Sequence, residues 1–128
     1  MNTMQEEFDA VVEHLFKQGR RSMNGRHCAY RGEEGTSCAV GCRIPDDYYD
    51  SVIDHGTSMT TTGLSTVLQR YPEHFPPEVH AYHEMFRKLQ DVHDMAITHS
   101  GGLFSKTSLR DDLVTVAREF HLTYNHKD

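Results

Sequence analysis

The chain has 128 residues, of which 37% are hydrophobic and 25% are charged, a composition typical of a folded globular protein rather than a disordered one. This length predicts one globular domain over residues 1–128. The net charge of -6 argues against a general nucleic-acid binder, because phosphate contacts need clustered cations. No apolar run approaches the roughly 20 residues of a membrane span, and no signal peptide opens the chain. Three cysteines without an export signal therefore predict a cytoplasmic protein with reduced thiols.

The first predicted element is a helix that begins after Thr3. Thr3 and Glu6 match a capping box, in which each side chain bonds the backbone N–H of the other residue. Apolar residues then recur at helical spacing, and Gly19 is suited to end the helix. The apolar stripe consists of Phe8, Val11, Val12, Leu15 and Phe16.

Two short strands are predicted next, at about residues 28–31 and 36–41. Residues 32–35 join them, and the glycine at each end of this linker allows the positive φ that a tight hairpin turn needs. Because a two-stranded hairpin is only marginally stable alone, we expect it to pack against helices. Pro45 and Asp46 then open a short helical turn, with Asp46 as its cap.

The rest of the chain is predicted to be helical, apart from an exposed loop at residues 57–63. A short helix begins at Leu64 and ends at Pro72. The longest helix runs from about 77 to 98, and a last helix runs from about 107 to 121. The predicted fold class is therefore α+β, mostly α: an N-terminal helix, a short two-stranded β-hairpin, and about four helices packed on it.

All three cysteines, Cys28, Cys38 and Cys42, lie in one stretch of the chain. Thiolates are preferred zinc ligands, but the C-x9-C-x3-C spacing lacks the C-x2-C knuckle typical of zinc modules. His27 would point to the opposite face of a strand from Cys28, whereas His55 could complete the set from a loop. No cofactor is expected, and zinc on the three cysteines is one alternative. The thiols otherwise serve as small buried hydrophobes, or one serves as a redox or catalytic cysteine whose pKa is lowered by neighbouring arginines.

A run of the chain between residues 17 and 31 contains cations and no acidic residue. The cations are Lys17, Arg20, Arg21, Arg26 and Arg31. These guanidinium groups could bind a phosphate, a nucleotide or an acidic partner surface through bidentate contacts. The alternative is a solvated helix end whose cations suit the helix dipole and pair with acidic residues of the same chain. Those acidic residues are Glu33, Glu34 and the aspartates between residues 46 and 54.

His93 and Asp94 lie late in the longest predicted helix, beside its apolar stripe. We expect His93 to be half buried and hydrogen-bonded, as a structural histidine rather than a catalytic one. Together with Tyr30, Arg31 and Gln90, these two residues are candidates for one polar network that links the hairpin to the helix. Such a network is either structural or the floor of a pocket.

Three short motifs lie along the chain. Residues 28–32 read C-x-YRG, residues 38–49 read CA-x-G-x-x-IPD-x-x-Y, and residues 89–94 read LQ-x-x-HD. This combination resembles a family of small uncharacterised proteins of tailed phages and prophages, over about residues 5–121. Arg43 departs from the family pattern, which has a small or apolar residue before Ile-Pro-Asp. The resemblance implies a phage context, and hence the cytoplasm of a bacterial host, but no activity.

From these features we expect an accessory protein that acts by binding a host or phage macromolecule, with a host or phage protein as its partner. Inhibition of a host enzyme or defence system is the use that the phage context implies. No catalytic constellation is recognisable, so an enzyme is not favoured. Nucleic acid and membranes are not expected partners, and the oligomeric state is open. The predicted binding residues are Arg20, Arg21, Arg26, Tyr30, Arg31, His93 and Asp94.

Two alternatives belong to other functional classes. One is a small enzyme, or a nucleotide- or phosphate-binding protein, that uses Arg31, His93 and Asp94; it requires these side chains to converge on a pocket. The other is a zinc-stabilised nucleic-acid-binding module, which requires bound zinc and a salt-dependent affinity for DNA or RNA.

Overall fold

A computed structural model describes residues 1–20, 22–24, 27–55, 63–95 and 106–127, with the backbone only at residues 23, 24, 27, 28, 55 and 95. This part of the chain contains six α-helices: α1 (Met4–Gln18), α2 (Val52–His55), α3 (Leu64–Arg70), α4 (Pro77–Ala81), α5 (His83–Met95) and α6 (Lys106–Glu119). The shorter elements are the 3-10 turns η1 (Glu33–Gly35), η2 (Gly41–Arg43) and η3 (Pro72–His74), and the two-residue strands β1 (Met23–Asn24) and β2 (His27–Cys28).

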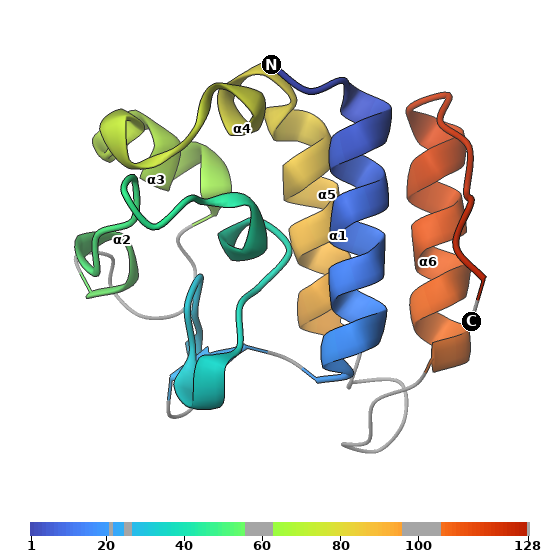
Figure 1. Ribbon diagram of the computed structural model, residues 1–128, viewed down its shortest axis with the longest axis horizontal. Helices are drawn as coiled ribbons and strands as arrows, with labels where there is room; N and C mark the ends of the chain where they lie inside the picture. The colour runs from blue at the N-terminus through green and yellow to red at the C-terminus, as the bar shows by residue number, and fades with distance from the viewer. Residues whose placement is uncertain (21, 25–26, 56–62, 96–105, 128) are drawn as a thin grey trace.

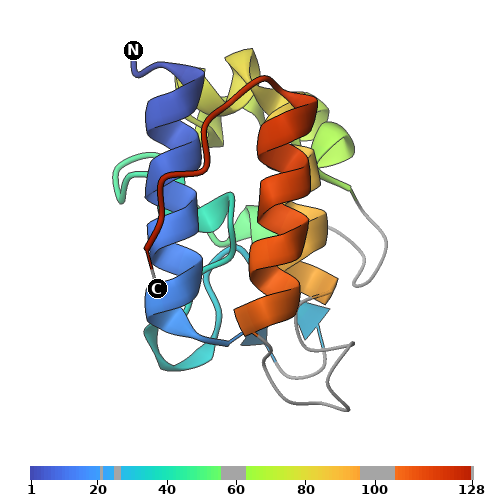
Figure 2. The same cartoon turned by 90° about the vertical axis from the view of Figure 1, so that its right-hand side faces the viewer.

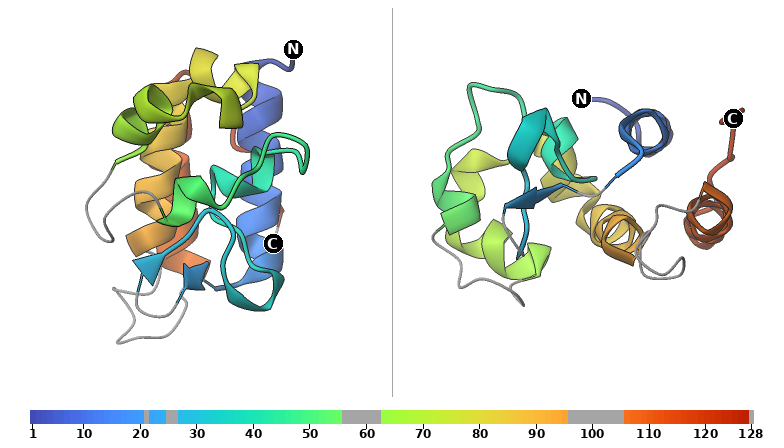
Figure 3. Two further views of the ribbon diagram at one scale, coloured as in Figure 1. Left: turned by 90° about the vertical axis from the view of Figure 1, so that its left-hand side faces the viewer. Right: turned by 90° about the horizontal axis from the view of Figure 1, so that it is seen from below.

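The three longest helices, α1, α5 and α6, run roughly along one direction and form one side of the molecule (Figure 1). Helix α6 packs against both α1 and α5, and α5 also contacts α3 and α4. Residues 29–55, which we call the loop layer, lie on the other side and contain η1, η2 and α2. After α6 the C-terminal segment turns back and crosses between α6 and α1 (Figure 2). Seen from below, the three long helices and the loop layer occupy separate parts of the molecule (Figure 3).

Helix α1 forms as its sequence predicts. The N–H of Glu6 donates to the Thr3 hydroxyl at 3.1 Å, and the N–H of Thr3 donates to the Glu6 carboxylate at 2.8 Å, which completes the capping box. Gly19 ends the helix at a left-handed φ of 68°. All five residues of the predicted stripe are buried, and each such side chain stabilises the fold by about 1.5–3 kcal/mol.

The hydrophobic core lies between α1, α5, α6 and the loop layer. Helix α5 contributes Met85, Phe86, Leu89 and Val92, and α6 contributes Leu109, Leu113, Val116 and Ala117. The loop layer adds Cys38, Ala39, Val40, Ile44 and Ile53. The loop layer is thus anchored in the same core as the helices, although little of it has regular secondary structure.

The predicted α+β class is wrong: the fold is helical. Of residues 28–31 and 36–41, where strands were expected, the structure places only Cys28 in a strand (β2), and the two segments share a single isolated bridge between Arg31 and Ser37. Elsewhere in the described chain the only strand pairing is the two-residue antiparallel ladder of β1 with β2. Within the predicted hairpin linker at residues 32–35, Glu33–Gly35 form η1, and φ is positive at Glu34 and Gly35 but not at Gly32.

The helix expected at about residues 77–98 is divided into α4 and α5. Tyr82 separates them with φ -114° and ψ 33°, and its hydroxyl donates to the Asn2 carbonyl at 2.8 Å. The helices predicted from Leu64 and at residues 107–121 correspond to α3 and α6. Residues 57–62 of the predicted exposed loop, and residues 96–98, lie outside the described residues. Of the helices that the structure describes, none has both the length and the apolar character of a membrane span.

Candidate functional site

The Asp54 carboxylate is the centre of the polar contacts within the loop layer. Its Oδ1 accepts the backbone N–H of Tyr30 at 2.7 Å, and its Oδ2 accepts the N–H of Arg31 at 3.3 Å. The Tyr49 hydroxyl also donates to Oδ2. Burial raises the pKa of Tyr49, and the hydrogen bond to Asp54 adds to that rise, so the phenol keeps its proton and remains a donor. One carboxylate therefore ties together three parts of the loop layer.

The Arg31 guanidinium is fixed on three sides. Its Nη2 donates to the Ile44 carbonyl at 3.0 Å and lies 2.7 Å from the Asp46 carboxylate. The guanidinium carbon also lies 4.2 Å from the centre of the Tyr49 ring, a cation–π contact. The Arg31 side chain is 33% exposed and the Asp46 side chain 95% exposed, so this cluster reaches the protein surface.

Tyr30 packs under this surface. Its ring meets the edge of Phe75 with centroids 5.8 Å apart, and burial raises the pKa of its hydroxyl. Gly41 approaches so closely that a Cβ there would lie 1.9 Å from the Tyr30 carbonyl oxygen. Only glycine fits at this contact, which fixes η2 against the segment that carries Tyr30 and Arg31.

Of the two cysteines whose side chains the structure describes, Cys38 is buried and Cys42 is partly buried. Cys38 accepts the Gly41 N–H on its sulfur at 3.2 Å, and the Cys42 thiol donates to the Ala39 carbonyl at 3.3 Å. Burial holds the pKa of Cys38 well above its usual range and raises that of Cys42 to about 12, although the neighbouring Arg43 lowers the latter. Both are protonated at neutral pH, which does not suit a thiolate nucleophile.

A zinc site on all three cysteines is not assembled by the part that the structure describes. Among those residues, no group of three or more histidine, cysteine, aspartate or glutamate side chains is placed to hold a metal ion. The side chains of Cys28 and His55 lie outside the described residues.

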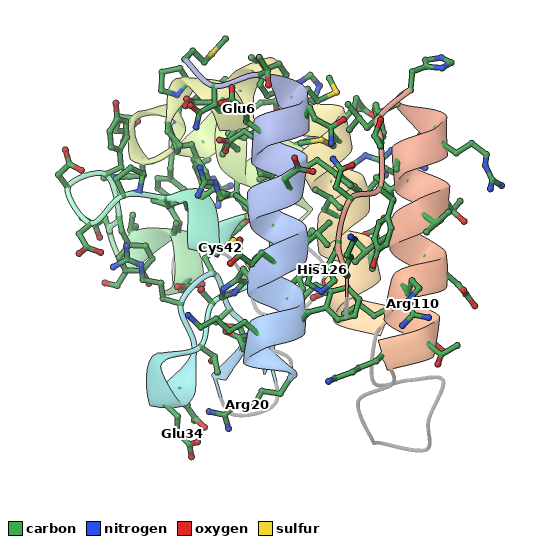
Figure 4. All side chains as sticks on the ribbon, turned by 45° about the vertical axis from the view of Figure 1, so that its right-hand side comes forward. Glu6, Arg20, Glu34, Cys42, Arg110 and His126 are labelled. Carbon is green, nitrogen blue, oxygen red and sulfur yellow. The ribbon has the colours of Figure 1, made fainter. Side chains whose placement is uncertain are left out.

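The basic run is only partly described. Arg20 pairs with Glu34 at 2.8 Å, with 50% and 73% of these side chains exposed (Figure 4). Arg31 pairs with Asp46, as described above. Arg21 and Arg26 lie outside the described residues. The two arginines that can be placed thus pair with acidic residues of the same chain, which was the alternative to a free basic patch.

His93 and Asp94 form a second network, on α5. The Ser22 N–H donates to Nε2 of His93 at 3.1 Å, so this nitrogen carries no proton and Nδ1–H donates to Asp94 at 3.0 Å. Gln90 donates to Asp94 at 3.1 Å and accepts the Val40 N–H at 3.4 Å. His93 is 2% exposed, more deeply buried than predicted. The network links the loop layer to α5 through Gln90, which bonds Val40, whereas His93 bonds Ser22, a residue that precedes the loop layer.

Two links between α1 and the loop layer were not predicted. Glu7, 2% exposed, accepts Nε and Nη2 of Arg43 at 3.0 and 2.9 Å, so the residue that departs from the phage-protein pattern has a buried partner. On the next turns of α1, His14 donates through Nε2 to the Ser37 carbonyl at 2.8 Å, and Gln18 accepts the Ser37 N–H at 2.9 Å. A sequence signal existed only for Glu7, a charged residue directly beside the apolar stripe.

The charged residues at the surface of the loop layer, together with Arg20, which pairs with Glu34, are what we call the loop face. Its residues are Arg20, Arg31, Glu33, Glu34, Asp46, Asp47 and Asp50. A comparison with protein-family models found no match, and neither a curated protein nor a solved structure proved similar to the chain. Functional inference therefore rests on the geometry of this face.

Proposed function

We propose that this chain is a binding protein that docks on a host or phage protein through the loop face. The observation that carries the proposal is the immobilisation of Arg31 by Ile44, Asp46 and the Tyr49 ring. Immobilising one long side chain on association costs about 0.5–1.5 kcal/mol of free energy. An arginine that is already held in one geometry avoids part of this cost. Irregular segments held on a rigid scaffold are also where binding residues concentrate.

The ion pairs at the surface support this role. Exposed pairs such as Arg20 with Glu34 contribute only about 0–1 kcal/mol to stability, so they can exchange partners at little cost. Charges of both signs on one face give selectivity and faster encounter with a complementary surface. Inhibition of a host enzyme or defence system is the specific form of binding that we propose.

The alternative enzyme or phosphate-binding function has less support. It needs Arg31, His93 and Asp94 in one pocket, yet the contacts of the Arg31 guanidinium are all within the loop layer. Both ring nitrogens of His93 already have partners, and the ring is buried. The proposed binding function requires no cofactor, and zinc on Cys28, Cys38 and Cys42 stays an alternative.

The proposal is tested by affinity capture with the tagged chain from nuclease-treated lysates of infected and uninfected bacteria. The loop variant carries Arg20→Ala, Glu34→Ala and Asp47→Ala, all exposed. The matched control carries Arg118→Ala, Asp111→Ala and Glu119→Ala, which are exposed on α6 and change the net charge by the same amount. Circular dichroism first establishes that both variants are folded.

We expect wild type and control to capture one protein in stoichiometric amount, and the loop variant to lose it. Equal capture by all three proteins, or no stoichiometric partner in either lysate, would contradict the proposal. Capture of nucleic acid from lysates without nuclease, weakened by salt, would instead support the nucleic-acid alternative.

A further inference from the structure

Residues 122–127, which we call the strap, cross from the end of α6 to α1 (Figure 2). Exposure alternates from one strap residue to the next, as it does along an extended peptide that lies with one face on a surface. The partly buried side chains are Leu122, Tyr124 and His126, and the exposed ones are Thr123, Asn125 and Lys127. The strap is thus held by every second side chain, in the manner of a bound peptide.

Contacts with α1 hold the strap at two places. The Gln5 side chain donates to the Thr123 carbonyl at 2.8 Å and accepts the Thr123 N–H at 2.9 Å. Further along, the His126 ring stacks on Phe16 with centroids 4.3 Å apart and 10° between the ring planes (Figure 4). None of these contacts depends on the covalent link between the strap and α6, so the strap of another copy can make them equally well.

The link between α6 and the strap is strained. His121 has a φ of 58°, in the left-handed region that a residue with a side chain adopts at a cost in free energy. The turn is closed by two hydrogen bonds, from the His121 N–H to the Arg118 carbonyl at 3.3 Å and from the Leu122 N–H to the Ala117 carbonyl at 2.7 Å. Glycine is the residue that usually ends a helix in this way, and here its place is taken by histidine.

A second arrangement of the link satisfies the same backbone groups. If α6 continued through Leu122, the His121 N–H would bond the Ala117 carbonyl and the Leu122 N–H would bond the Arg118 carbonyl. Both donors and both acceptors stay bonded, and the left-handed φ of His121 is relieved. The strap would then extend beyond α6 and leave its place on α1 empty. Short strained hinges favour the exchange of such an element between two copies of a chain.

We propose that two copies of this chain form a dimer by exchanging their straps, each strap lying on α1 of the other copy between Gln5 and Phe16. A second copy is the partner because its strap has the sequence that fits this place on α1. The exchanged dimer regains every strap contact, and relief of two strained hinges opposes the entropic cost of association. The strap lies on the opposite side of α1 from the loop layer (Figure 3), so the proposal is independent of the loop face.

The first test is sedimentation velocity of the full chain over a wide range of concentrations, with two variants of the hinge residue. We expect wild type to dimerise as its concentration rises. His121→Gly favours the left-handed turn and should weaken dimerisation about tenfold. His121→Ala disfavours that turn and favours a continued helix, so it should strengthen dimerisation about tenfold.

Both variants remove the imidazole, so each controls for the loss of side-chain contacts in the other. Wild type that stays monomeric at every concentration, or equal dimerisation of the glycine and alanine variants, would overturn the proposal.

A second measurement establishes whether the dimer forms by exchange of straps. Chains labelled with 13C are mixed with unlabelled chains and brought to equilibrium at high concentration, and isotope-filtered NOEs are recorded on the dimer. We expect NOEs between the Phe16 ring of one chain and the His126 ring of the other, because these rings are stacked. A dimer that lacks these NOEs forms through another surface, and that result would also overturn the proposal.

Discussion

Asp54 accepts the backbone N–H of Tyr30 at 2.7 Å, from 24 positions further along the chain. The same carboxylate accepts the N–H of Arg31, so one side chain satisfies two consecutive backbone donors that would otherwise need other partners. This relationship explains how the loop layer keeps one conformation with so little regular structure.

Replacing Asp54 should therefore loosen the whole loop layer. Asp54→Ala removes three hydrogen bonds to a charged acceptor and leaves the N–H groups of Tyr30 and Arg31 without this partner. We expect the free energy of unfolding to fall by about 2–4 kcal/mol, measured by urea denaturation. The exposed Asp47→Ala, as control, should change it by less than about 0.5 kcal/mol. Similar losses in both variants would show that Asp54 has no special role.

The pairing of Glu7 with Arg43 should show strong coupling. Arg43→Met leaves the buried Glu7 carboxylate without its cation, and we expect the free energy of unfolding to fall by about 3 kcal/mol. This value is at the lower end of the range for a buried pair because the Arg43 side chain is 29% exposed. Glu7→Leu with Arg43→Met removes both charges and should recover more than half of that loss. A double-mutant cycle by chemical denaturation measures the coupling, and additive effects of the two substitutions would contradict it.

Gly41 should not tolerate a side chain. A Cβ would lie 1.9 Å from the Tyr30 carbonyl oxygen, and because that oxygen is a backbone atom and the Cβ is fixed to the Gly41 backbone, the clash is relieved only if the backbone shifts. We expect Gly41→Ala to destabilise the protein by about 3 kcal/mol in thermal or chemical unfolding. Gly63→Ala, where the added Cβ meets nothing within 4 Å, should change stability by less than about 1 kcal/mol. Equal effects at the two glycines would refute the close contact.

Alkaline pH should destabilise the protein partly through Cys42. Burial raises the pKa of this thiol from 9.0 to about 12, so the folded protein holds the proton more tightly than the unfolded chain. Its contribution is complete below pH 9 and is lost as pH rises toward 12, by up to about 1.4 kcal/mol per pH unit. Cys42→Ala should flatten the slope of unfolding free energy against pH between 9 and 11. Identical slopes for variant and wild type would contradict this assignment.

The sequence predicted α1 well because its signals are local. The capping box, the apolar stripe and Gly19 lie within a few residues of the contacts that they make, and α3 and α6 follow from the same periodicity. The hairpin prediction failed because the segments that flank Gly32 and Gly35 share only the bridge between Arg31 and Ser37, whereas the N–H groups of Tyr30 and Arg31 are bonded by Asp54. The break at Tyr82 likewise involves a contact with Asn2, 80 positions away, that no local pattern reveals.

The sequence identified several residues of the candidate site but not how those residues are arranged in space. Arg31 and the His93–Asp94 pair were identified, but the sequence could not show that they belong to separate networks. Tyr49 and Asp54 were visible only as part of an aromatic and acidic turn. Their role depends on the position of Arg31 in space, which the tertiary packing of the loop layer decides.

The most direct test of the central claim is the side-by-side capture by wild type, the loop variant and the α6 control. The account predicts that a stoichiometric protein partner is retained by the α6 control and lost by the loop variant, in which only exposed side chains of the loop face are truncated. If the loop variant retains the partner and the α6 control loses it, the loop face is not the binding surface.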